Sequence, residues 1–159
     1  KNPLNRALRI DKMTLVALEA TLRQYLDPAQ AAEKIPTLAA ITRDPKQLQN
    51  RATRLAALIR KHFSSFFAIS TRSDASRVGG GASPEVALPT RLVCLHPRQG
   101  LSPDKLRRDL LQTDPPVVGR VDADCFCLDP RTLLPGDSPL IVDAFRQVLG
   151  EERDEGMKK

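Results

Sequence analysis

Two arginines near the start of the chain have the type and spacing needed to hold an anion. Arg6 and Arg9 stand three residues apart within the segment NPLNRALRIDKMTLVALEATLRQYL, residues 2–26. Because residues at that spacing share one face of a helix, both guanidinium groups could hold one oxyanion through bidentate, charge-assisted hydrogen bonds. A phosphate or a selenophosphate fits such a pair. From the residues alone, the alternative is an ordinary solvated pair on the surface.

A second group of side chains has the chemistry of metal ligands. Cys94 and His96 stand two residues apart, as do Cys125 and Cys127, so two neighbouring strands could project all four into one space. The C-x-C spacing differs, however, from the C-x₂-C knuckle that is usual for structural zinc. We therefore predict no metal site and interpret the cysteines as small core residues. Nothing in the local sequence predicts the lowered thiol pKa of a catalytic cysteine.

Three successive glycines, Gly79–Gly81, could let a backbone approach a phosphate. No Lys-Ser or Lys-Thr pair follows them, as a P-loop requires, and no strand-to-helix frame supports a dinucleotide fingerprint. We interpret the glycines as a turn that needs positive φ. Scattered carboxylates such as Asp104 and Asp109 lack the spacing of a general acid and base.

Helices would position the two arginines. Asn2 can cap a short first helix, and Asp11 or Lys12 starts a long one. Apolar residues recur every three or four positions along the long helix, which predicts an amphipathic stripe with a Glu19–Arg23 ion pair outside it. The stripe comprises Leu15, Leu18, Leu22 and Tyr25, with Leu26 beside it.

A second long helix is predicted from Pro45, capped by Asp44, to about His62. Residues 28–35 before it predict a further short helical turn that ends before Pro36. The basic residues Arg51, Arg54, Arg60 and Lys61 lie off the apolar side and are interpreted as a solvated face. The side predicted to be buried carries Leu48, Ala52, Leu55, Ile59 and Phe63.

Strands would position the cysteines. Residues 66–69 predict a strand that ends in the polar stretch STRSDAS, and residues 90–96 predict a second strand. Residues 115–128 are typical of a β-hairpin that turns at residues 122–124. Two further helices are predicted, one capped by Ser102 with Leu106 and Leu110 facing inward, and one from Ser138 to Gly150.

The order helix, helix, strand, strand, helix, hairpin, helix predicts an α+β fold, with a small antiparallel or mixed sheet and helices on one face. A chain of 159 residues with 41% hydrophobic residues is long enough for one domain with a sizeable core. No apolar run approaches the roughly 18 residues of a membrane-spanning helix, and the first residues do not resemble a signal peptide. Three cysteines without a secretory signal favour a reducing cytoplasm.

The basic residues are dispersed along the chain. A net charge of +6 would attract polyanions, but aromatic residues make up only 4% and Trp is absent. No stacking platform for a single nucleic-acid strand is therefore predicted. A solvated basic face is the simpler interpretation of the charge.

Several segments together resemble one family, the bacterial selenocysteine synthases, or L-seryl-tRNA(Sec) selenium transferases. The resemblance begins with residues 2–26 and continues in the same order almost to the end of the chain. The later matching segments are KIPTL (34–38), VGGGASPEVALP (78–89), PPVVGRV (115–121) and CLDPRTLLP (127–135).

The resemblance implies the C-terminal small domain of a pyridoxal-phosphate enzyme of fold type I, the aspartate-aminotransferase type. It implies the end of the large domain and a linking helix over residues 1–35, a C-terminal α+β domain over 36–150 and a disordered tail over 151–159. The Schiff-base lysine of the family lies upstream, so we expect this chain to be inactive alone and to bind no pyridoxal phosphate. Lys12 is accordingly interpreted as a first-turn helix residue.

By the same resemblance, Arg6 and Arg9 line the active site and bind the anionic selenium donor. The implied partners of the full-length, cytoplasmic homo-oligomer are seryl-tRNA(Sec) and selenophosphate. The family has a similar glycine segment, which suggests that Gly79–Gly81 lie near the active site, and Arg120 is either an active-site residue or an exposed structural arginine. Two other hypotheses remain open: a related fold type I lyase or cysteine-desulfurase-like enzyme, and a non-enzymatic basic RNA-binding module.

Overall fold

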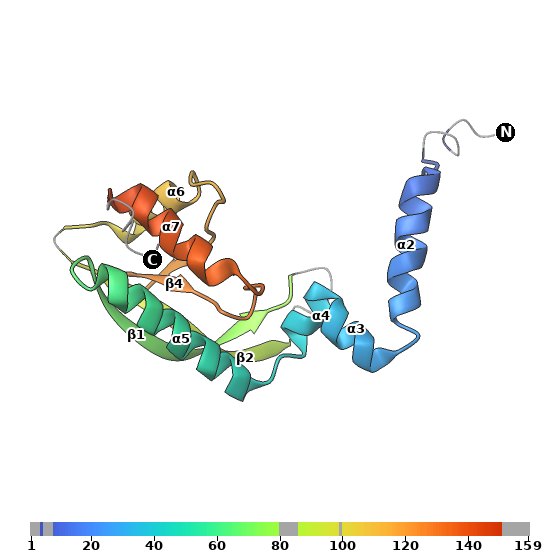
Figure 1. Cartoon of the computed structure of the whole chain (residues 1–159), viewed down its shortest axis with the longest axis horizontal. Helices are drawn as coiled ribbons and strands as arrows, with labels where there is room; N and C mark the ends of the chain where they lie inside the picture. Colours follow the sequence, from blue (N-terminus) through green and yellow to red (C-terminus); the bar gives the residue numbers. More distant parts are fainter. Residues whose placement is uncertain (1–3, 5–7, 80–85, 99, 151–159) are drawn as a thin grey trace, which may run out of the picture. The chain divides into compact units, whose positions relative to one another are not determined.

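The long amphipathic helix predicted near the start is α2 (Lys12–Gln24) in the structure, a computed structural model that describes residue 4 and residues 8–79, 86–98 and 100–150 (Figure 1). Of the two predicted starting residues, Asp11 is the cap of α2 and accepts a hydrogen bond from the Thr14 backbone N–H at 2.9 Å. The predicted Glu19–Arg23 pair is also confirmed, at 2.7 Å. The apolar stripe stays open to solvent: Leu15, Leu18 and Leu22 are 50%, 48% and 56% exposed.

Two short helices follow, α3 (Pro28–Lys34) and α4 (Pro36–Ile41). The first is the predicted short helical segment, and it is capped by Asp27. The second was not predicted, because Pro36 was interpreted as the end of the segment. Proline also suits the first position of a new helix, where its missing N–H costs nothing. The chain divides into two compact units, Lys1–Thr42 and Arg43–Lys159.

The second unit begins with α5 (Pro45–Phe63), which Asp44 caps as predicted. All five residues predicted to face inward are buried. The solvated interpretation of the basic residues is wrong for Arg51 but holds for the other three, which are exposed. Arg51 is half-buried and donates to the Leu133 carbonyl, and Arg60 donates to the Ile69 carbonyl at 2.9 Å. Their long stems carry the guanidinium groups to carbonyls outside the helix.

Four antiparallel strands form one sheet in the order β1-β2-β4-β3. The α+β prediction is therefore confirmed, with an antiparallel sheet. Residues 70–76, predicted to follow the first strand, instead continue it, because each pairs with a residue of the second strand from Cys94 back to Leu88. The strands are β1 (Phe67–Arg77), β2 (Ala87–Pro97), β3 (Arg120–Asp122) and β4 (Cys125–Leu128).

Helices α5, α6 (Pro103–Leu110) and α7 (Asp137–Leu149) pack their apolar sides against one face of this sheet. Figure 1 shows α5, in green, running along the β1–β2 hairpin. Phe145 of α7 lies at the centre of the core, with its ring centroid 5.5 Å from Phe63, 5.7 Å from Phe67 and 6.3 Å from Phe126. The sheet residues on this face are Phe67, Ile69, Val93, Leu95, Val121, Phe126 and Leu128.

The hairpin of β3 and β4 turns through two residues, Ala123 and Asp124, both with positive φ (47° and 59°). Two positive φ angles in a two-residue loop are the signature of a type I′ turn, whose twist matches that of the strands. The turn fixes the register that places Asp122 opposite Cys125. Among the described residues, no helix is long and apolar enough to cross a membrane.

Candidate functional site

The structure places only one of the two arginines predicted to bind an anion. Arg6 lies outside the described residues, so the convergence of the pair stays a prediction. Arg9 is described and exposed, two residues before the Asp11 cap of α2. Within the described part of the chain, its guanidinium forms no hydrogen bond or ion pair.

The sheet face away from the helices, called the outer face here, gathers most of the other candidate residues. Its register aligns Ser70, Cys94, Cys127 and Arg120 in one row across the four strands. Side chains alternate along each strand, so the neighbours two positions away lie on the same face. The outer face therefore carries Cys94, His96, Cys125 and Cys127, together with Arg120 of the VGR segment.

Arg120 forms an ion pair with Asp74 of β1, and Arg72 of β1 forms one with Asp122 of β3. These pairs connect the two edge strands over β2 and β4. Arg72 also lies 3.4 Å from Asp74. A backbone hydrogen bond from Ala75, then the charges of Arg120 and Arg72, hold the pKa of Asp74 below its usual value. Arg120 thus has the partner of a structural arginine, although its side chain remains 49% exposed.

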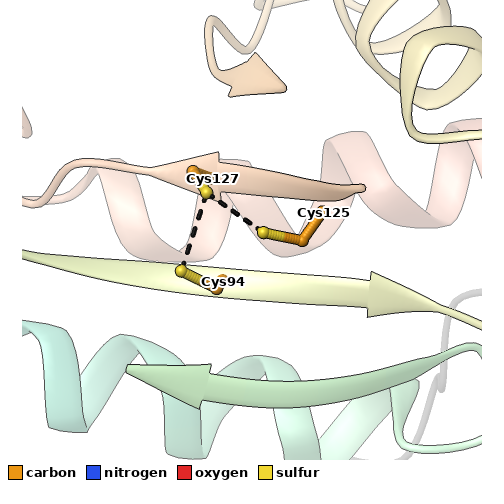
Figure 2. Close-up of side chains that lie close together, drawn as sticks. All are labelled: Cys94, Cys125 and Cys127. Atoms are coloured by element: carbon orange, nitrogen blue, oxygen red, sulfur yellow. Dashed lines mark hydrogen bonds between the residues drawn. The ribbon is translucent and has the colours of Figure 1, made fainter. Parts of the chain in front are cut away.

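Beneath these ion pairs, Cys94, Cys125 and Cys127 are at most 2% exposed (Figure 2). The Cys127 sulfur lies 3.4 Å from that of Cys125 and 3.6 Å from that of Cys94. Figure 2 shows Cys127 of β4 between its two neighbours, one on its own strand and one on β2. The prediction that the cysteines are buried is confirmed. Burial raises the pKa values of the Cys94 and Cys127 thiols, which keeps both groups protonated near neutral pH.

His96 does not join this cluster. Its Nε2 atom lies 3.2 Å from the Ser70 hydroxyl, toward β1. The sequence pattern therefore predicted correctly that the four residues share one face of the sheet. On that face, however, the imidazole contacts β1, whereas the cysteines cluster between β2 and β4.

Sequence reasoning missed a polar network around Asp129 and Arg131. The Asp129 carboxylate accepts hydrogen bonds from the Thr90 hydroxyl at 2.7 Å, from the Ser76 hydroxyl, and from the Arg131 backbone N–H at 3.0 Å. Arg131 is buried and donates to the Pro89 carbonyl. Together these contacts tie the start of β2 to the segment after β4. The only signal in the sequence was the pair of charges on either side of Pro130, directly after a buried strand.

Other candidates have ordinary structural roles. Gly79 has no positive φ, and Gly80 and Gly81 lie outside the described residues. Lys12 occupies the first turn of α2, as predicted. It is exposed, as are the other described lysines. The described lysines are Lys12, Lys34, Lys46, Lys61 and Lys105.

Comparisons with known proteins agree on one enzyme. A family model described as "SelA: L-seryl-tRNA selenium transferase" matches residues 1–134. The curated L-seryl-tRNA(Sec) selenium transferase of Solidesulfovibrio magneticus is 54% identical over 153 residues, covering 96% of this chain and 33% of the relative. The corresponding enzyme of Desulfovibrio desulfuricans is 51% identical, with 94% and 32% covered, and that of Moorella thermoacetica 44%, with 93% and 31% covered. The chain thus spans about a third of the length of these relatives.

Proposed function

The chain belongs to the L-seryl-tRNA selenium transferase family, and we propose that it is the C-terminal part of an enzyme that converts seryl-tRNA(Sec) to selenocysteinyl-tRNA(Sec). Selenophosphate would be the selenium donor. The observation that carries this proposal is the match over residues 1–134, because it includes the whole segment with Arg6 and Arg9. The proposed enzyme is a cytoplasmic homo-oligomer, as the resemblance implies.

The resemblance also implies pyridoxal phosphate and a fold type I architecture for the full-length enzyme. By the same resemblance, the lysine that attaches this cofactor lies upstream of the segment with Arg6 and Arg9, and the described lysines are all exposed. We therefore propose that the attachment lysine belongs to the two thirds of the relatives that this chain does not match. The unit that starts at Arg43 would be the small domain of that architecture.

We assign to Arg9, together with Arg6, the binding of the anionic donor. Arg9 is exposed and forms no ion pair with a described residue, so its guanidinium can accept an anion without first losing a partner. Arg72 and Arg120, by contrast, are engaged with Asp122 and Asp74. A charge-assisted hydrogen bond contributes about 1.5–3 kcal/mol, which corresponds to about a 10- to 150-fold change in binding.

The test compares Arg6→Ala and Arg9→Ala with Arg23→Ala in the full-length enzyme. Arg23 is a matched control, because its guanidinium is also exposed near the start of the chain but is paired with Glu19. Selenocysteinyl-tRNA formation is measured at several selenophosphate concentrations, and the absorbance of the bound cofactor reports loading. At limiting selenophosphate we expect a loss of at least about tenfold in the first two variants, with cofactor absorbance retained.

Normal turnover of both variants would refute the assignment. The same preparations, offered free cysteine in place of seryl-tRNA(Sec), test the desulfurase-like alternative. Release of sulfur from cysteine without selenium transfer would favour that alternative over the proposed function.

A further inference from the structure

We propose that Cys94, Cys125 and Cys127 form a buried binding site for zinc(II), with three thiolate ligands and one bound water molecule as the fourth ligand. The three sulfur atoms all lie within 4.8 Å of one another. With zinc–sulfur bonds of about 2.3 Å, tetrahedral geometry places two sulfur ligands about 3.8 Å apart. The two shorter separations here, 3.4 and 3.6 Å, require the side chains to move by only a few tenths of an ångström.

The backbone holds the three ligands in place. Cys94 and Cys127 are directly opposite each other on adjacent strands, and Cys125 lies two positions from Cys127 on the same face. Ligands on paired strands are held in position more precisely than ligands on loops, because the ladder of hydrogen bonds fixes the backbone of both strands. The type I′ turn at Ala123 and Asp124 directly precedes Cys125 and fixes its register.

The surroundings suit zinc(II) bound by three thiolates. The metal and its three ligands together carry a charge of −1. The guanidinium of Arg72 lies above the cluster, and its positive charge opposes the effect of burial on the Cys94 thiol. Soft thiolate ligands select zinc and similar metals over hard cations such as magnesium. The metal would displace the thiol protons, as thiolate coordination requires.

The competing explanation is that the thiols only fill space. Three features argue against it: the sulfurs contact one another, the only other member of their buried cluster is Leu92, and the main core lies on the other face of the sheet. His96 is not assigned as a ligand, because it is not part of the group of ligand atoms that lie within 4.8 Å of one another, and its Nε2 atom lies near the Ser70 hydroxyl instead. It therefore provides a control on the same strand and the same face.

The experiment titrates the reduced 159-residue chain with cobalt(II), and then with zinc(II) as competitor. The three cysteines of the cluster are all the cysteines of the chain, so a count of reactive thiols reports on this site alone. We expect one cobalt per chain, with thiolate charge-transfer absorption and the intense visible bands of tetrahedral cobalt. Zinc should abolish these bands and protect all three thiols from a thiol reagent.

The variants separate a metal site from a packing role. Each of the variants Cys127→Ser, Cys94→Ala and Cys125→Ala should lower the affinity for cobalt at least a hundredfold. The two alanine variants are included because they add no buried hydroxyl group. His96→Ala should bind like the wild type, and circular dichroism checks the fold of each variant. The proposal is overturned if the folded wild-type chain retains no cobalt, or if folded Cys94→Ala and Cys125→Ala bind it as well as His96→Ala does.

Discussion

Gly119 offers a direct test of why the VGR segment needs its glycine. A methyl group built on Gly119 would lie 2.6 Å from Cε2 of Phe126 and 2.9 Å from the Cys127 carbonyl oxygen. Neither neighbour can move away easily. Phe126 is fully buried and packs edge-on against Phe145, and the carbonyl belongs to the backbone of β4. Gly119→Ala therefore forces an overpacked arrangement at the edge of the core.

The expected magnitude follows from two opposing effects. Overpacking typically costs about 1–3 kcal/mol, whereas replacing glycine by alanine gains about 0.4–1 kcal/mol by restricting the unfolded chain. The difference of the two midpoint values is a net loss of about 1.3 kcal/mol in the free energy of unfolding for Gly119→Ala. Gly79→Ala is the matched control, because among the described residues no atom beyond its chain neighbours lies within 4 Å of the added methyl group, and its φ is not in the left-handed region.

Urea unfolding followed by far-UV circular dichroism measures both variants against the parent chain. We expect a lower midpoint for Gly119→Ala and an equal or higher one for Gly79→Ala. Phe126→Leu in the background of Gly119→Ala should recover part of the loss, as a double-mutant cycle would show. Equal midpoints for the two alanine variants would refute the steric argument.

Two further predictions concern the core and the start of α2. Phe145→Ala should lower the free energy of unfolding by about 3–5 kcal/mol, because it removes a fully buried ring that contacts three others. The same urea titration measures this loss, and a value under about 1 kcal/mol would contradict the assigned core. Hydrogen bonds from the Thr14 hydroxyl and then from its backbone N–H lower the pKa of Asp11. The stabilisation by this cap should therefore be fully present above the pKa of the unfolded state, and be lost as the pH falls through the lower pKa of the folded state. The amide chemical shift of Thr14 reports this titration, and a midpoint at or above the ordinary aspartate pKa would show that the cap is not formed.

The helices were predictable because their signals are local. Asp44 and Ser102 each stand at the cap position that the sequence indicated, and Asp11 is one of the two residues predicted to start α2. Each of the three accepts a hydrogen bond from a backbone N–H of the first turn. The apolar period of α5 identified its buried side, since neighbours on a helix face are only three or four residues apart. α4 was missed because a proline at a helix start and a proline after a helix end look alike in sequence.

The extent of β1 was not predictable in the same way. Residues 70–76 are polar, and their strand conformation depends on pairing with β2, which lies beyond the glycine segment. On the outer face, Arg72 and Asp74 obtain their partners from β3, about fifty residues later in the chain. Contacts at such separations leave no periodic trace in the local sequence, so a strand of this kind is mistaken for a loop.

For the candidate site, the sequence predicted a common face for Cys94, His96, Cys125 and Cys127, and the register confirms it. The spacing argument against a metal site concerned C-x-C within one strand. It could not include the distance across strands, which is what brings Cys94 to 3.6 Å from Cys127. The pairing of His96 with Ser70 likewise depends on β1 and was not visible in the sequence.

The net charge of the chain does not show which arginines are available to a ligand, because some of them are engaged in contacts within the fold. Arg43 and Arg51 donate to carbonyls of residues 130–133, and Arg131 to the Pro89 carbonyl, so these cations hold the fold together. A net charge of +6 therefore overstates the surface available to a polyanion. Arg9 differs because it is exposed and forms no ion pair with a described residue. A guanidinium without an ion pair to any described residue is available for a ligand, which is why Arg9, and not the paired Arg120, is the arginine to substitute first.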